Sequence, residues 1–207
     1  MRLTAFACAL LLPASVTAQE APSFPQTDLV QVQIDGQLNV RSGPSTEAPR
    51  VTRVASGEIL RRVACEATTE DEAWCEIEFI DGSLEGWASA RFLTPWYGAD
   101  PAVLDTPVIA AAKTFDMGRA SDLSGTLAQG ETIDVQVKVA AEADAQISLD
   151  APDGFGLAVF EPSGKKIDAS KTAEDLDVML MKAGTLTIRI ADLGGTGGAW
   201  TLTVQRN

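Results

Sequence analysis

The sequence predicts an all-β protein made of a small barrel followed by an antiparallel β-sandwich. Short apolar runs with a period of two residues, typical of half-buried strands, recur along the chain. Glycine- and proline-containing turns separate these runs at short intervals, as in small barrels and sandwiches. The composition changes near residue 107, after which cysteine is absent and the alternating runs are longer. This change indicates two folded units.

The N-terminus has the order of a secretory signal peptide. Arg2 precedes an apolar run, Leu3–Pro13, and small residues then lead to Ala18, the predicted cleavage site. The run is shorter than the roughly 20 apolar residues that a membrane helix needs. We therefore expect residues 1–18 to be removed and the mature protein to be periplasmic or secreted, with no membrane span.

Residues 19–28 follow the predicted cleavage site and form a leader. The stretch contains Pro22 and Pro25 and no alternating apolar pattern, so we expect it to be mobile.

The cysteines predict one internal disulfide. Cys8 lies inside the signal peptide, and the two that remain are Cys65 and Cys75, separated by nine residues. An even pair in an exported chain usually forms a disulfide, because the compartment outside the cytoplasm is oxidising. A reactive thiol would need a neighbouring base, and the chain has no histidine.

The first unit, residues 29–94, consists of short strands and tight turns. Val30, Val32 and Ile34 alternate with polar residues, and Arg41–Ser45 forms a loop rich in turn formers. The octet Leu38–Ser45, LNVRSGPS, resembles the opening of bacterial SH3 (SH3b) domains. Further landmarks of that family follow in the same order: Gly57 before Ile59-Leu60, Trp74 before Ile77, Gly86-Trp87 and Phe92-Leu93. The resemblance implies an SH3-like barrel and recognition of a ligand in the cell wall or of a peptide.

Four residues of this unit are candidate ligand-binding residues. Arg41 and Ser42 lie in the turn-rich loop, and Trp74 and Trp87 flank it in the expected barrel. A guanidinium group pairs well with carboxylates, and indole faces stack on sugar or peptide groups. The alternative is that both tryptophans belong to the core. Arg61 and Arg62, with Arg53, form a basic cluster that we interpret as a solvated strand face.

Residues 95–106 contain two prolines and a glycine and are predicted to be the linker. Residues 107–207 carry longer alternating runs, such as Ile133–Val139, Leu186–Ile190 and Trp200–Val204. Turns between them, one of them the Gly194–Gly198 run that we expect to be a flexible hairpin, complete the pattern of an antiparallel sandwich.

This second unit resembles the pre-peptidase C-terminal domain and the periplasmic lysozyme inhibitors. The matching segments are Ser124–Leu127, Ile133–Val139, Phe160–Gly164, Gly184–Arg189 and Ala199–Val204. They are mainly turn and core positions, so the resemblance implies a fold more than an activity.

The composition argues against catalysis, metal binding and nucleic-acid binding. The net charge is −13, which would repel phosphates, and the chain contains no histidine for a catalytic triad or a histidine zinc site. We interpret the acidic side chains near the disulfide as an exposed loop and the solvent side of a strand: Glu66, Glu70, Asp71, Glu72, Glu76 and Glu78. The alternative calcium ligands, which we interpret as solvated turns, are Asp150, Asp153, Glu174, Asp175 and Asp177.

The sequence thus predicts a non-catalytic exported binding protein without a cofactor. Its partner would be peptidoglycan or an envelope protein or peptide. The alternatives are a periplasmic lysozyme inhibitor that acts through the sandwich, and a protein-binding envelope scaffold.

Overall fold

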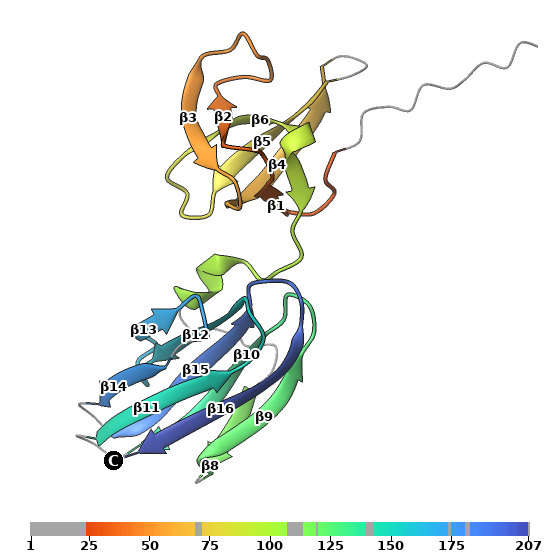
Figure 1. Ribbon diagram of the computed structural model, residues 1–207. Coiled ribbons are helices and arrows are strands. Elements are labelled where there is room, and N and C mark those ends of the chain that lie inside the picture. The colour runs from red at the N-terminus through yellow and green to blue at the C-terminus, as the bar shows by residue number, and fades with distance from the viewer. Residues whose placement is uncertain are drawn as a thin grey trace, which may run out of the picture.

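A computed structural model describes residues 24–68, 72–106, 114–118, 120–139, 143–173, 175–180 and 183–206. The predicted signal peptide, with Cys8 and the cleavage site, lies outside these residues. Figure 1 shows an upper unit of short strands and a lower unit of longer strands, joined by one segment. In the part of the chain that is described, no helix is long and apolar enough to cross a membrane.

The upper unit is a seven-stranded antiparallel sheet in the order β3-β2-β6-β5-β4-β1-β7. Its strands are β1 (Leu29–Val32), β2 (Gln37–Arg41), β3 (Arg50–Ala55), β4 (Ile59–Ala67), β5 (Ala73–Phe79), β6 (Glu85–Ser89) and β7 (Leu93–Pro95), with a 3₁₀ turn, η1 (Ala90–Phe92), before β7. The sheet wraps around a common interior but does not close by hydrogen bonds between β3 and β7. This arrangement confirms the SH3-like part of the predicted fold.

The interior of the upper unit is small and is linked by the predicted disulfide. Twelve buried apolar residues of the described part form its core, among them Val30, Leu60 and Ile77. Cys65 and Cys75 lie directly opposite each other on β4 and β5 and are bonded, with Cα atoms 4.0 Å apart. The disulfide prediction is confirmed. It links two neighbouring strands of a unit whose core is too small to supply much stability by itself.

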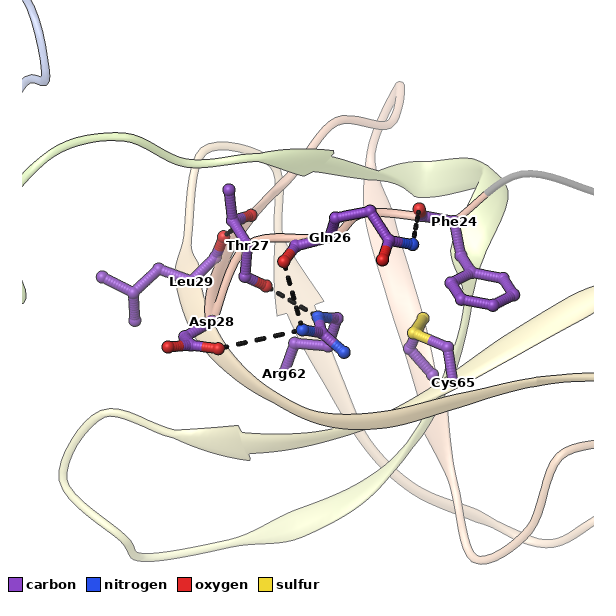
Figure 2. Close-up of polar contacts among 8 residues, drawn as sticks. Phe24, Gln26, Thr27, Asp28, Leu29, Arg62 and Cys65 are labelled. Atoms are coloured by element: carbon purple, nitrogen blue, oxygen red, sulfur yellow. Dashed lines mark hydrogen bonds and ion pairs between the residues drawn. A yellow bond between two sulfur atoms is a disulfide. The ribbon is translucent and has the colours of Figure 1, made fainter.

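The last residues of the predicted leader pack on this unit, so the expectation of a mobile leader is wrong for residues 24–28. Figure 2 shows the guanidinium of Arg62 beneath this segment. Its Nε donates to the carbonyl of Thr27 at 2.6 Å, and an Nη lies 3.8 Å from the carboxylate of Asp28. Phe24 packs against the core cluster near Cys65. Arg62 is therefore not part of a solvated face: it binds the segment that enters β1.

The predicted linker also lies against its neighbours. A 3₁₀ turn, η2 (Pro101–Leu104), is capped by the Asp100 carboxylate, which accepts a hydrogen bond from the backbone of Ala102. Asp100 also forms an ion pair with Arg61 of β4. Leu104 is buried against the outer face of the lower unit, where it meets Phe160. The linker segment thus contacts both units. The exact domain boundaries stay predictions.

The lower unit is a sandwich of two sheets. One has the order β13-β12-β15-β10-β8 and the other β14-β11-β16-β9. The strands are β8 (Thr114–Gly118), β9 (Asp122–Leu127), β10 (Thr132–Val139), β11 (Ala143–Asp150), β12 (Phe155–Phe160), β13 (Lys166–Ser170), β14 (Leu176–Leu180), β15 (Gly184–Asp192) and β16 (Gly198–Arg206). All described pairs are antiparallel except β8 with β10, which is parallel. The predicted sandwich is confirmed, with this one departure from a purely antiparallel pattern.

Buried charged side chains hold the linker and the loops onto the sandwich. Arg189 of β15 makes a two-pronged bond to Asp134 of β10, with N–O distances of 2.8 and 2.9 Å. It also donates to the carbonyls of Val103 and Thr106 in the linker segment. Asp192 accepts hydrogen bonds from the backbone N–H groups of Gly130, Thr196 and Gly197. The glycine-rich hairpin, expected to be flexible, is therefore held by a buried carboxylate.

Candidate ligand-binding site

The upper unit carries a hollow of about 270 Å³. Strand β2, the loop after it, the start of β5, the end of β6 and η1 supply the lining. Two of the four predicted site residues, Arg41 and Trp74, line this hollow. Ser42 and Trp87 do not line it: Ser42 is exposed next to Arg41, and half-buried Trp87 lies opposite Arg41 on β6.

Arg41 is positioned by the loop that follows it. Its Nη1 donates a hydrogen bond to the carbonyl of Ala48 at 2.7 Å, while the backbone of Ser42 closes the same loop on Pro49 at 2.9 Å. A guanidinium group has five N–H donors, so this contact leaves most of them available. The turn-rich segment of the octet thus serves to hold a half-buried cation at the edge of the hollow.

Trp74 lies on the face of β5 opposite the core. Its neighbours Ala73 and Cys75 belong to the core cluster, and side chains alternate between the two faces of a strand. Trp74 pairs with Ser89 on β6, which also lines the hollow. Although Trp74 is only 4% exposed, its Nε1–H has no hydrogen-bond partner among the described residues. The tryptophan is thus buried, but on the outer face of the sheet and away from the core cluster.

Sequence reasoning did not identify Arg91, Asn39 and Glu72 as lining residues. Arg91 lies in η1, with its guanidinium carbon 4.5 Å from the centre of the Phe92 ring. The alternation along β2 places Asn39 on the same face as Arg41, and this signal could have identified it. Nothing in the local pattern places Arg91 or Glu72 beside Arg41, because they come from separate parts of the sheet.

The described residues contain no cluster that could hold a metal ion. No group of three or more cysteine, aspartate or glutamate side chains within them could hold a metal ion. Of the alternative calcium ligands, Asp150 ends β11, Asp177 lies in β14, and Glu174 falls outside the described residues. Glu70 and Asp71 of the acidic cluster also fall outside them, whereas Glu76 and Glu78 lie on the outer face of β5.

The turn between β5 and β6 contains a carboxyl group whose pKa departs from its ordinary value. Asp81 accepts hydrogen bonds from the side chain and backbone of Ser83, the latter at 2.9 Å, and these bonds hold the pKa of Asp81 below 3.8. The group is exposed and does not line the hollow, and its bonds to Ser83 stabilise the turn.

Comparison with solved structures finds distant likenesses to both groups that the second unit resembles. The periplasmic inhibitor of g-type lysozyme from Aeromonas hydrophila, PliG, is 16% identical with a TM-score of 0.43, over 47% of this chain and all of that one. The pre-peptidase C-terminal domain of a Bacillus anthracis collagenase is 17% identical with a TM-score of 0.39, over 44% of this chain and 94% of that one. PliG from Salmonella Typhimurium is 12% identical with a TM-score of 0.40, over 47% of this chain and all of that one. At these low scores none of them bears on what this chain does.

The family comparison addresses the upper unit. No curated protein matches the chain. Residues 36–94 match the family model of the bacterial SH3 domain. This range begins just before β2 and ends within β7, so it contains the octet, both cysteines of the disulfide and every described lining residue of the hollow except Ile34. Residues 36–94 of this chain are therefore a bacterial SH3 domain.

Proposed function

We propose that this chain is a non-catalytic binding protein of the bacterial envelope, whose SH3 domain recognises peptidoglycan or an envelope peptide. The hollow that contains Arg41 and Trp74 is the observation that carries the proposal. It combines fixed hydrogen-bond donors with apolar side chains, which is the usual composition of a ligand pocket. The predicted signal peptide and the disulfide fit a protein that works outside the cytoplasm.

The charge distribution supports recognition through this hollow. The whole chain has a net charge of −13, yet two arginines and one glutamate line the hollow. Cationic groups in such an acidic molecule would attract the anionic groups of a ligand locally, while the rest of the surface repels polyanions. Peptidoglycan peptides offer carboxylates for the arginines.

Co-sedimentation with purified peptidoglycan tests the proposal on the mature full-length chain. We expect the chain to sediment with peptidoglycan, and the Arg41→Gln variant to bind about tenfold more weakly, as expected for loss of a charge-assisted hydrogen bond. Arg50→Gln removes the same charge from an exposed position outside the hollow and should bind like the unchanged chain. If the unchanged chain stays in the supernatant, the proposed function is wrong.

Inhibition of a lysozyme through the sandwich is the alternative that the sequence resemblance suggests. It is tested with the same mature protein against c-, g- and i-type lysozymes. Inhibition that persists in the Arg41→Gln variant would assign the activity to a surface outside the hollow. An absence of inhibition at micromolar protein would exclude this alternative.

A further inference from the structure

We infer that the hollow of the SH3 domain binds a carboxylate group, held by the guanidinium groups of Arg41 and Arg91 and by the indole N–H of Trp74. This inference rests on the proposed function, because it names the chemical group that the domain reads in its ligand. All three side chains line one hollow, although they come from β2, β5 and η1.

The two arginines supply the charge. Arg41 is half-buried, and the contact with the Ala48 carbonyl orients its guanidinium without neutralising it. Arg91 stacks on the Phe92 ring and has no carboxylate partner within the described part of the chain. Guanidinium groups bind carboxylates through paired N–H donors, so two of them around one small hollow favour a planar anion.

Trp74 supplies the second, independent observation. A buried N–H group without an acceptor is rare in folded proteins, because it has lost water and gained nothing in exchange. The Nε1–H of Trp74 is in this state, and Trp74 lines the hollow. An acceptor oxygen brought by a ligand would satisfy this donor. The buried Nε1–H groups of Trp96 and Trp200 also have no acceptor within the described ranges, but neither residue lines the hollow.

The net charge of the lining favours a carboxylate over a phosphate. Two arginines and Glu72 leave one positive charge, which matches a singly charged anion. A phosphate monoester carries almost two negative charges at neutral pH and would meet the glutamate as well. Apolar side chains, among them Ile34, Ala73 and Phe92, complete the lining. They suit a short apolar group next to the carboxylate, such as the methyl group of an alanine.

The four tryptophans of the chain make a site-specific titration possible. Each gives one indole N–H signal in a proton–nitrogen correlation spectrum, and Trp74→Phe assigns the signal of Trp74. The mature full-length chain is titrated with acetyl-D-alanyl-D-alanine, which has a terminal carboxylate, and with its C-terminal amide. Acetyl-glutamic acid α-amide presents a side-chain carboxylate, and inorganic phosphate is the fourth probe.

We expect acetyl-D-alanyl-D-alanine to shift the Trp74 signal in a saturable way and to leave those of Trp96 and Trp200 in place. The amide should bind at least about tenfold more weakly, because the charge-assisted hydrogen bonds are lost. Arg41→Gln and Arg91→Gln should each weaken binding by about tenfold, whereas Arg50→Gln should not. Arg91 makes no described backbone contact through its side chain, so its variant separates loss of binding from loosening of the Arg41 loop.

The probes decide between the sources of the carboxylate. Tighter binding of acetyl-D-alanyl-D-alanine than of acetyl-glutamic acid α-amide assigns the hollow to a chain terminus, and the reverse assigns it to a side chain. The inference is overturned if acetyl-D-alanyl-D-alanine and its amide bind equally well, or if phosphate binds as well as acetyl-D-alanyl-D-alanine. If the chain sediments with peptidoglycan but no carboxylate probe shifts the Trp74 signal, the inference is wrong and the proposed function stands. A Trp74 shift without sedimentation contradicts the proposed function alone.

Discussion

The SH3 domain and the sandwich are stabilised by different features. Among its described residues, the SH3 domain has a core of twelve buried residues and a disulfide between two of its strands. The described part of the sandwich has a core cluster of eighteen buried residues and no disulfide. It also buries Asp134, Arg189 and Asp192. The burial of a larger apolar core offsets the free energy lost when charged groups are buried. A small core contributes less, and a covalent link adds to its stability.

The two regions also differ in the side chains that line the hollows of their sheets. The linker packs on the outer face of β12 and β15 through Leu104 and the bonds from Arg189. The same sheet keeps a hollow next to Phe160 and Thr187, but no arginine belongs to the described lining of that hollow. The hollow beside Trp74 is lined by two arginines. This difference in charge favours the smaller unit as the place of the candidate site.

The largest effect is expected from breaking the buried ion pair of the sandwich. Arg189→Met leaves Asp134, which is 1% exposed, without its cation. The free energy of unfolding should fall by about 3–5 kcal/mol. Urea unfolding, followed through the indole signal of Trp200, measures this loss. Lys166→Gln, which breaks an exposed ion pair with Asp105, should cost at most about 1 kcal/mol. Equal losses in the free energy of unfolding for the two variants would show that the buried pair contributes no more stability than the exposed one.

Removal of the disulfide should act on the other region. In the double variant Cys65→Ala and Cys75→Ala, the SH3 domain should lose about 2–3 kcal/mol, because the short loop no longer restricts the unfolded chain. The indole signal of Trp87 reports this unfolding, and that of Trp200 reports the sandwich. An equal loss at both signals would mean that the two units unfold together and that the disulfide does not stabilise the SH3 domain alone.

A smaller effect is expected at the crossing of β2 and β6. A Cβ atom on Gly86 would lie 2.6 Å from Cγ1 of Val40 and 2.8 Å from the carbonyl oxygen of Arg41. Since backbone cannot easily move aside, Gly86→Ala should cost about 1–3 kcal/mol and displace Arg41 from the hollow. Gly43→Ala is the matched control, because its Cβ would meet only the Ala48 side chain at an ordinary 3.6 Å. Thermal unfolding of both variants measures the difference, and similar midpoints would contradict this account.

The smallest effect is a pH dependence at the turn after β5. The pKa of Asp81 lies below 3.8 because Ser83 hydrogen-bonds to the charged carboxylate, so folding favours the ionised form. Its contribution to stability is complete above pH 3.8 and is lost as the pH falls through the lowered pKa of the folded state. An NMR titration of the Asp81 carboxyl carbon should give a midpoint below 3.8, and Asp81→Asn should remove this part of the acid sensitivity. A midpoint at or above that value would contradict the prediction.

Much of the fold could be predicted because it depends on local pattern. Alternation with a period of two predicted strands at Val30–Ile34, where β1 ends at Val32, and at Ile133–Val139. The even pair of cysteines in an exported chain predicted the bond between Cys65 and Cys75. The octet and the landmarks that follow it predicted the SH3 domain, which the family comparison confirms. The parallel pairing of β8 with β10 could not be predicted in this way, because periodicity identifies the faces of a strand and not its neighbours.

Part of the candidate site could be predicted, and part could not. Arg41 and Trp74 were selected for their chemistry, and the structure places both in one hollow, while their role as ligand-binding residues stays a proposal. Arg91 was missed, since it reaches the hollow only through the 3₁₀ turn before β7. Arg62 was misinterpreted as a solvated residue, because its partners, Thr27 and Asp28, lie far from it in the sequence.

The sequence by itself determined the all-β class, the disulfide and the SH3 identity, because each depends on residue types and short motifs that can be recognised along the chain. The tertiary structure alone decided which side chains share the hollow and that the buried indole N–H of Trp74 meets no acceptor in the described part of the chain. It also decided that Arg189 ties the linker to the sandwich. The physical reason is the same in each case. Pattern sets the face on which a side chain lies, and only packing sets what meets it there.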